Sequence, residues 1–399
     1  MSVIFNGYRR PSGKVGIRNF VAVLPAIHLA NELSDRMANQ VDGVVKLLHN
    51  FEESFLGIDK ERGIKSVVGL GASPNVYAVL VVGVHCESIT AEEIAKRINE
   101  AGGNAYSITI TRERNYEQTL EEGVALLRKL IAEADEQKRE PCDVSELIVG
   151  VRCGGSGAIS AISSNAATGA AVDLVIQHGG TAIFSETAEL IGADKILAKR
   201  AKTPEVAKKL FKTVQNMQDK ICAYGVDILG YEPTKFNLDQ GLTTIEEKSM
   251  GAIVKSGTTP LIDVLEYAAA PTRGPGLYFM DSSVQSPILF AGMIAAGCHL
   301  QLFSYGGGFA ARSRNLTTYP SNIKTYPVIK IMGSTNDDVA IPYFDIYAGD
   351  IIRGEKSIEE VGKELFNKII SIASGEETFT DQAVSYTEMI QLYADGLLM

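Results

Sequence analysis

Two short histidine-containing segments carry the side chains that bind transition metals. His49 precedes a pair of glutamates, and His85, Cys86 and Glu87 form a second group. Each segment follows an apolar, β-rich run, and ligands gather at the carboxyl ends of strands in α/β sheets. Imidazole, thiolate and carboxylate together suit a borderline divalent ion such as Fe²⁺, Mn²⁺ or Zn²⁺. The pattern predicts a metal site, although CxxC and HExxH spacings are absent and each residue alone is also typical of a packed core.

A second reactive stretch is Thr-Thr-Ile-Glu-Glu-Lys-Ser at residues 243–249. Two overlapping T-x-x-E capping boxes predict that a helix begins here. Glu246 and Glu247 point about 100° apart on such a helix, so only one of them faces a given cleft. Lys248 could neutralise an anionic substrate or, if a cation or burial lowers its pKa, remove a carbon-bound proton. The alternative is a capped surface helix with solvated charges.

Two glycine clusters follow predicted strands and offer backbone N–H groups to an anion. They are Gly154-Gly155-Ser156-Gly157 and Gly306-Gly307-Gly308, and Arg312 and Arg314 come shortly after the second. Such turns bind anions, and arginine pairs with carboxylate or sulfonate groups. The spacing matches neither G-x-G-x-x-G nor a P-loop, so a nucleotide site is not predicted. The alternative is that the glycines only form tight turns.

Composition and charge exclude several classes of protein. The 399 residues include 48 acidic and 38 basic side chains, a net charge of −10 that repels nucleic acid and anionic lipid. Apolar runs such as 78–84 are shorter than the roughly 20 residues of a membrane span. The N-terminal residues lack the pattern of a secretory signal, so we expect a cytoplasmic protein. Five scattered cysteines argue against a disulfide framework, and the absence of a G-x-S-x-G elbow argues against acyl transfer.

Short β-rich runs alternate with amphipathic stretches, which is typical of an α/β fold with parallel strands. We expect strands at 20–24, 44–48, 78–84, 105–110, 147–151, 181–185, 261–265, 276–280, 300–304 and 328–332. Helices are expected at 29–38, 91–101, 113–136, 204–224, 287–296 and 357–374, and from about residue 243. Residues 226–240 lack a clear period and predict a linker. The sequence thus predicts two lobes, each a mostly parallel sheet flanked by helices, with domains at 1–230 and 231–399.

Several segments together resemble one enzyme family. They are Gly7-Tyr8-Arg9-Arg10-Pro11 with Gly16-Ile17-Arg18-Asn19, Cys153-Gly154-Gly155-Ser156, residues 241–249 (Gly-Leu-Thr-Thr-Ile-Glu-Glu-Lys-Ser) and residues 370–375 (Ile-Ser-Ile-Ala-Ser-Gly). With them the chain resembles the altronate and galactarate dehydratase family over nearly its whole length, most specifically at residues 241–249. The resemblance covers the large catalytic part, and it implies an oligomer in which a small partner subunit supplies the SAF-type domain of many members.

The resemblance implies a metal-assisted β-elimination from a small hydroxy acid, giving an enol that becomes a 2-keto acid. Such a reaction needs a base for the α-proton, a cation for the enolate, and an acid or metal for the leaving group. We expect Lys248, Glu247 and Glu186 to be catalytic, with Lys248 as the base or the enolate stabiliser. Substrate contacts are expected from Arg18, Asn19, Asn237, Thr244 and Arg312. The metal, Fe²⁺ or Mn²⁺, is expected at His49, Cys86 and Glu87.

Departures from the family pattern leave the substrate open. In the resemblance, sugar-acid dehydratases of this family have a cysteine shortly after the histidine that corresponds to His49. This chain has Asn-Phe-Glu-Glu-Ser there, at residues 50–54. Residues 233–235 and 274–281 look closer to the large subunit of the sulfolactate sulfo-lyase branch, which expels sulfite instead of water. Lys235, Arg312 and Arg314 would suit a sulfonate. The family resemblance as a whole predicts a sugar-acid dehydratase. A sulfolactate sulfo-lyase and a non-catalytic anion-binding subunit are the alternatives.

Overall fold

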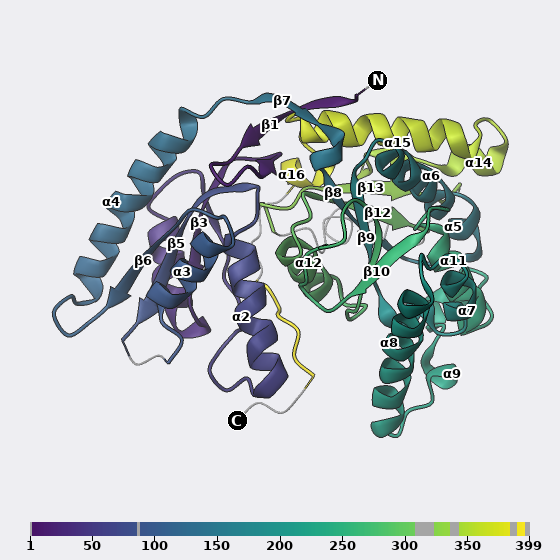
Figure 1. Ribbon diagram of the computed structural model, residues 1–399, viewed down its shortest axis with the longest axis horizontal. Helices are drawn as coiled ribbons and strands as arrows, with labels where there is room; N and C mark the ends of the chain where they lie inside the picture. The colour runs from purple at the N-terminus through teal and green to yellow at the C-terminus, as the bar shows by residue number, and fades with distance from the viewer. Residues whose placement is uncertain (1, 86–87, 308–322, 336–342, 384–388, 396–399) are drawn as a thin grey trace.

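The computed structural model describes residues 2–85, 88–307, 323–335, 343–383 and 389–395 (Figure 1). It has two α/β lobes, as the sequence predicts. One is built on a four-stranded sheet of order β4-β3-β5-β6, and the other on a seven-stranded sheet of order β10-β11-β9-β8-β12-β13-β14. All the strand pairs in both sheets are parallel. A small antiparallel sheet, β2-β1-β7, was not expected from the sequence.

The four-stranded lobe follows the predicted alternation of strands and helices. Its strands are β3 (Phe20–Pro25), β4 (Val44–Lys46), β5 (Val76–Val84) and β6 (Ala105–Ile110), and its helices are η1 (His28–Ala30), α1 (Asn31–Ala38), α2 (Gly57–Gly71), α3 (Ala91–Glu100) and α4 (Tyr116–Asp135). Helix α4 begins at a capping box of Asn115 and Gln118, and it buries an apolar stripe with a spacing of three and four residues that includes Leu120, Val124 and Leu127. Helix α2 was not predicted, because its glycines and charges obscure the apolar period.

The seven-stranded lobe contains most of the remaining elements. Its strands are β8 (Ile148–Gly154), β9 (Thr181–Phe184), β10 (Leu261–Leu265), β11 (Gly276–Met280), β12 (Leu300–Tyr305), β13 (Val328–Met332) and β14 (Ile346–Tyr347). Its helices are η2 (Val144–Glu146), α5 (Ala158–Ile162), α6 (Ser164–Gln177), η3 (Thr187–Leu190), α7 (Asp194–Ala198), α8 (Pro204–Ala223), α9 (Ile228–Tyr231), α10 (Lys235–Asp239), α11 (Ile245–Val254), α12 (Ser286–Ala295), α14 (Gly349–Arg353), α15 (Ile358–Ala373) and α16 (Phe379–Ala383). The small antiparallel sheet consists of β1 (Ile4–Arg9), β2 (Val15–Gly16) and β7 (Glu140–Asp143).

The predicted division at residue 230 cuts across the larger sheet. Strands β8 and β9 precede that position, yet β9 pairs with β11 and β8 pairs with β12. The two sheets are separated instead near residue 140, between α4 and β8. The predicted linker at 226–240 contains the short helices α9 and α10. Parallel pairing joins strands that are more than 80 residues apart, and no local sequence pattern reports such a contact.

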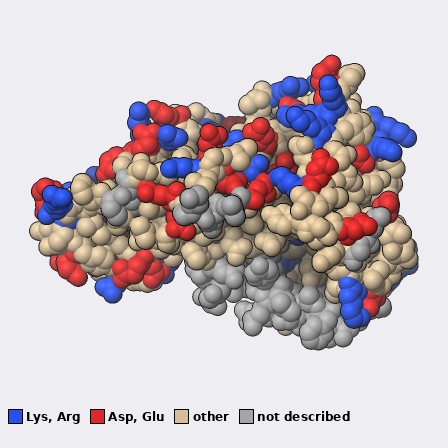
Figure 2. Space-filling view, turned by 90° about the horizontal axis from the view of Figure 1, so that it is seen from below, with Lys and Arg blue, Asp and Glu red and all other residues tan. Residues whose placement is uncertain are grey.

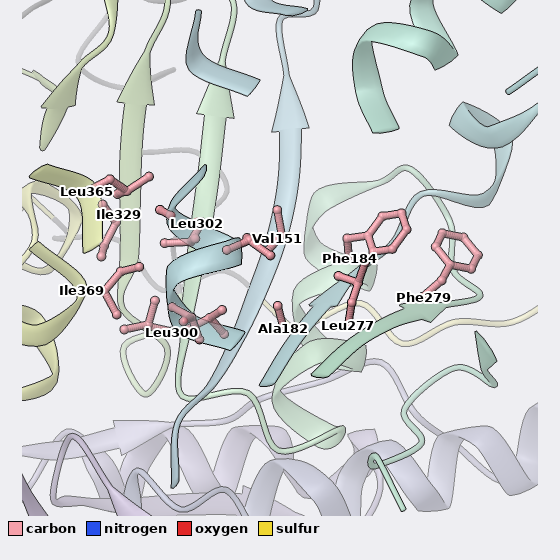
Figure 3. Packing of buried hydrophobic residues seen from close by; sticks show 14 of the residues in the cluster. Val151, Ala182, Phe184, Leu277, Phe279, Leu300, Leu302, Ile329, Leu365 and Ile369 are labelled. Carbon is pink, nitrogen blue, oxygen red and sulfur yellow. The ribbon is translucent and has the colours of Figure 1, made fainter. Parts of the chain in front are cut away.

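Apolar side chains cover both faces of the seven-stranded sheet. On one face, Val151, Leu302 and Ile329 pack with Leu365 and Ile369 of α15 (Figure 3). Helix α6 packs against α15 on the same side. The continuous stretch 158–177 of α5 and α6 has the length and hydropathy of a membrane span, but 56% of its apolar 18-residue part is buried inside the protein. Its apolar composition is therefore that of a core helix.

The opposite face of this sheet shares a core with the four-stranded lobe. One contiguous cluster contains Leu24 and Val81 of the smaller sheet together with Ile183 and Phe303 of the larger one. Helix α2 packs directly against α12 between them. The lobes are therefore joined by buried apolar surface and not by a flexible connection.

On the surface shown in Figure 2, lysine and arginine side chains are interspersed with aspartate and glutamate.

Asn75 also joins the two lobes. Its side-chain carbonyl accepts a hydrogen bond from the backbone N–H of Ile17 (2.9 Å), and its amide donates to the carbonyls of His299 (2.7 Å) and Thr325 (2.8 Å). Replacing Asn75 by alanine is expected to lower the free energy of unfolding by about 2–5 kcal/mol, because the buried partners lose their hydrogen bonds. Urea denaturation measures this change. Asn216→Ala, on the exposed side of α8, is the matched control, with an expected change within about 0.5 kcal/mol.

Candidate functional site

Ionisable side chains gather at the carboxyl end of the seven-stranded sheet. Cys153 lies at the end of β8, and Glu186 and Glu189 lie just after β9. Lys248 lies in α11, and Lys255 follows its last residue. Strand β8 lies between β9 and β12, where successive connections take opposite directions across the sheet. Ligand sites of open α/β sheets form at this kind of switch point.

The ammonium group of Lys255 is at the centre of this cluster. It donates hydrogen bonds to Cys153 Sγ (3.0 Å), Glu186 Oε2 (2.6 Å) and Glu189 Oε2 (3.2 Å). Glu186 also accepts hydrogen bonds from the backbone N–H of Cys153 (3.2 Å) and from Arg152 Nη2 (3.1 Å). The three N–H bonds of the ammonium thus have three acceptors, which is its full donor capacity.

These contacts continue as a chain of alternating charges that leads toward the surface. In order, its members are Arg152, Glu186, Lys255, Glu189, Lys248 and Glu232. Lys248 Nζ lies 3.7 Å from Glu189 Oε1 and 2.7 Å from Glu232 Oε2. The exposed fraction of the side chain is 1% at Lys255, 10% at Lys248 and 23% at Glu232. We call this series the charged chain, and its outer end is the part that a substrate can reach with the least rearrangement.

Burial and neighbouring charges push the pKa values of the two central carboxyls apart. Burial and the charge of Glu189 raise the pKa of Glu186. Burial alone would raise the pKa of Glu189 as well, but the ammonium groups of Lys255 and Lys248 outweigh it and hold that pKa at about 2. Two carboxyls separated in this way are suited to different roles, one exchanging a proton and the other remaining charged.

The same environment keeps the lysines protonated. Burial opposes the charge of Lys248, but the carboxylates of Glu189 and Glu232 outweigh it and raise its pKa above the usual value. The pKa of Lys255 is raised in the same way by Cys153, Glu186 and Glu189. Burial raises the pKa of the Cys153 thiol to about 12. The role of base that the sequence allowed for Lys248 therefore does not suit its surroundings, whereas the role of enolate stabiliser does.

Local backbone features bring these side chains together. Glu186 has φ of 86°, a left-handed conformation that a residue with a side chain adopts only when its contacts impose it. Lys248 and Lys255 are seven residues apart, so they project from the same face of α11. Gly169 of α6 permits this arrangement, because a Cβ there would lie 2.4 Å from the carbonyl of Val254. A larger residue at 169 would push away the end of α11 that presents Lys255.

Asn237 connects α10 to the glycine loop after β8. Its amide donates to the carbonyl of Ser156 (2.9 Å), and its oxygen caps α10 through the backbone N–H of Thr234 (3.1 Å). The Ser156 hydroxyl lies 3.8 Å from Cys153 Sγ. The second loop approaches closely, since a Cβ at Gly306 would lie 2.1 Å from the carbonyl of Gly155. The first loop and Asn237 thus lie beside the cluster.

Other predicted substrate residues have structural partners. Arg18 donates to the carbonyl of Ile372 (2.8 Å) and pairs with Asp381 (3.0 Å), far along the chain. Asn19 accepts from Arg10 (2.6 Å) and donates to the carbonyl of Ala134 (2.8 Å). The structure does not bring Arg18 or Asn19 into contact with the cluster.

Thr244 and Glu247 form the start of α11, as the capping boxes predict. The Thr244 hydroxyl accepts from the backbone N–H of Glu247 (3.1 Å), and the Glu247 carboxylate accepts from the N–H of Thr243 (2.8 Å). Hydrogen bonds from Thr243 lower the pKa of the exposed Glu247. Both residues position the helix that carries Lys248, and the Glu247 carboxylate pairs with Thr243 and not with a member of the charged chain among the described residues.

The predicted metal ligands are not assembled in the described residues. His49 is buried, with Nε2 2.9 Å from the carbonyl of Pro25 and Nδ1 accepting from the N–H of Phe51 (3.2 Å). Burial lowers its pKa to about 4, so its ring is neutral and both nitrogens have partners. Cys86, Glu87, Arg312 and Arg314 lie outside the described residues.

Three members of the cluster were not chosen from the sequence. Cys153 lies in one of the segments that resemble the family, and Glu189 and Lys255 were not named as site residues. The seven-residue spacing of Lys248 and Lys255 was the available signal for the second lysine. The contacts of Glu186 and Glu189 depend on the pairing of β8 and β9, which the sequence does not report.

Within the described part of the chain, one group of His, Cys, Asp or Glu side chains has ligand atoms close enough to hold a metal ion. It consists of Cys153, Glu186 and Glu189, whose ligand atoms all lie within 4.8 Å of one another. One sulfur and two carboxylate donors suit Fe²⁺, Mn²⁺ or Zn²⁺. The Lys255 ammonium, however, donates to all three donor groups. In this arrangement the three residues fit a lysine and do not accommodate a divalent ion as well.

Two family models match the chain. Residues 7–135 match the second domain of D-galactarate dehydratase/altronate hydrolase, and residues 144–395 match the C-terminal region of D-galactarate/altronate dehydratase. The junction between them coincides with the division between the two sheets. The cluster lies entirely within the second match.

Individual relatives agree with these matches. The chain is 32% identical to the (2R)-sulfolactate sulfo-lyase subunit beta of Chromohalobacter salexigens, over 97% of this chain and 96% of that subunit. It is 30% identical to the altronate dehydratase of Escherichia coli K12, over 94% of this chain and 75% of that enzyme. It is 29% identical to the galactarate dehydratase (L-threo-forming) of the same organism, over 95% of this chain and 74% of that enzyme. By these matches the chain belongs to the D-galactarate/altronate dehydratase family, a family of lyases.

Proposed function

We propose that the protein catalyses β-elimination from a small hydroxylated carboxylate, with loss of water to give a 2-keto acid. The observation that carries this proposal is the charged chain. In it Glu186, a carboxyl of raised pKa, contacts Lys255, and Glu189 links Lys255 to Lys248; both lysines are held in the protonated form. β-Elimination needs a base for the α-proton and a cation for the enolate oxygens. The charged chain offers both a base and a cation at the carboxyl ends of β8 and β9.

Each residue has a distinct proposed role. Lys248, near the outer end of the charged chain, binds the carboxylate of the substrate and stabilises the enolate that develops from it. Glu186 takes the α-proton, since its raised pKa makes it the stronger base of the two central carboxyls. Glu189 stays ionised between the two lysines and holds both in place.

A requirement for Fe²⁺ or Mn²⁺ is a separate part of the proposal. When bound, such an ion would supply Lewis acidity to the departing hydroxyl group. The predicted ligands are His49, Cys86 and Glu87, but His49 has both ring nitrogens engaged in this structure. We therefore assign neither the α-proton transfer nor the enolate stabilisation to a metal.

Cleavage of sulfolactate, with release of sulfite and pyruvate, is the second candidate. The 32% identity to a sulfolactate sulfo-lyase subunit along almost its whole length favours it. The same base and the same enolate stabiliser would serve this reaction, because only the leaving group differs. Sulfite leaves without prior protonation more readily than hydroxide does, so the acid requirement is smaller. A non-catalytic anion-binding subunit is the third alternative, and it would form no product from any of these acids.

An anaerobic assay with and without Fe²⁺ or Mn²⁺ tests the proposal. Altronate, galactarate and racemic sulfolactate are supplied separately, with and without an added SAF-type partner protein, and 2-keto acid and sulfite are measured in parallel. We expect keto acid without sulfite from a sugar acid. Equal amounts of pyruvate and sulfite from sulfolactate would establish the second candidate instead. A folded protein that forms neither product under any of these conditions would contradict both.

A further inference from the structure

The Lys255 ammonium lies where a metal ion would bind the triad of Cys153, Glu186 and Glu189. Its distances to the three donor atoms are 3.0, 2.6 and 3.2 Å. A divalent ion bound to the same atoms would lie about 2.0–2.3 Å from each of them. The ion and the ammonium would then compete for one set of lone pairs. The side chains of Lys255 and Glu186 are each only 1% exposed. If a metal ion displaced the ammonium from the triad, bulk water could therefore not solvate it in place of the lost acceptors.

The surrounding charges are already balanced without a metal. Three carboxylates alternate with three cations in the charged chain. A divalent ion that binds the Cys153 thiol as a thiolate would release one proton and add a net charge of +1 to a buried site, beside two lysines and an arginine. Buried charge without a partner is strongly unfavourable. Both the geometry and the charge count therefore favour a lysine as the cation of this site.

We propose that Lys255 is the resident cation of the triad and excludes divalent metal from it. The inference deepens the proposed function, and it rests on that function in assigning the triad to the catalytic centre. If a metal is required for turnover, it must then bind elsewhere in the protein. Lys255 acts as a positioning residue, since it orders Glu186 and Glu189 and lies deeper than Lys248.

Cobalt absorption tests this proposal without relying on activity. A thiolate bound to Co²⁺ gives an intense ligand-to-metal charge-transfer band, and Cys153 is the thiol of the triad. We compare the full-length wild type with Cys153→Ser, so that binding at other cysteines cancels in the difference. The expected difference is zero. A charge-transfer band that is present in the wild type and lost in Cys153→Ser would overturn the proposal.

Removal of the ammonium should create the metal site. Lys255→Met keeps the length of the side chain without its charge. This variant is expected to gain a thiolate–cobalt band with about one ion bound per chain, and Lys255→Met combined with Cys153→Ser is expected to lack the band. A folded Lys255→Met variant that gains no band would contradict exclusion by the ammonium. If this variant does not fold, the comparison of the wild type with Cys153→Ser decides alone.

The cobalt result and the lyase assay fail independently. No product from any substrate, together with equal cobalt spectra of wild type and Cys153→Ser, would reject the proposed function and leave the lysine as the cation. Turnover together with a wild-type band that depends on Cys153 would reject only the exclusion of metal. The two ideas can therefore be judged separately.

Discussion

Replacing Lys248 by methionine is expected to lower kcat by about 10²–10³-fold. Loss of a preorganised group that stabilises developing negative charge has an effect of this size. Lys248 is 10% exposed and pairs with Glu189 and Glu232, so its ammonium is held in place before substrate arrives. The measurement is steady-state turnover on whichever acid proves to be the substrate.

Lys208→Met is the matched control for this variant. Lys208 is an exposed lysine on α8, in the same lobe, and its replacement should leave kcat unchanged. Circular dichroism and urea denaturation establish that both variants are folded. Wild-type turnover by a folded Lys248→Met protein would remove Lys248 from the catalytic machinery.

Replacing Glu186 by glutamine is expected to lower kcat by about 10²–10⁴-fold, the range attributed to general-base catalysis. Burial and Glu189 raise the pKa of Glu186, and a base acts only when it is ionised. Wild-type turnover should therefore fall as the pH decreases through this raised pKa, which lies above the ordinary 4.5 of a glutamate. A pH–rate profile measures this acidic limb.

The pH profile separates catalysis from a structural role of Glu186. The residual activity of Glu186→Gln should lack the acidic limb, whereas a loss of packing would leave the limb at its original position. Glu246→Gln, an exposed glutamate on the same helix as Lys248, should keep both the rate and the limb. An unchanged limb in Glu186→Gln would assign the ionisation to a different group.

Much of the architecture was predictable because it depends on local patterns. The capping boxes at Thr243 and Thr244 and the apolar stripe of α4 located their helices, and the β-rich runs located nearly all the strands of the two parallel sheets. The order of the strands was not predictable in this way. The predicted boundary at residue 230 separates β9 from its partner β11 and β8 from its partner β12, which follow some 90 or more residues later.

The residues of the candidate site were also predictable only where a local pattern reports them. Lys248, Glu186 and Asn237 were all chosen from the sequence. In the structure, the Asn237 amide joins α10 to the loop after β8 through the carbonyl of Ser156. Lys255 could not be recognised, because its importance arises from acceptors on β8 and after β9 that only the folded sheet brings together. Arg18 was predicted to contact the substrate. In the structure its guanidinium donates to the carbonyl of Ile372 and pairs with the carboxylate of Asp381.

The apolar cluster shared by the two sheets has a consequence for how the protein denatures. Since α2 and α12 bury their facing surfaces against each other, neither lobe can melt without exposing the other's interior. The two segments matched by separate family models are therefore not independent folding units in this chain. Heating should give one calorimetric transition, with a van't Hoff enthalpy equal to the total heat absorbed.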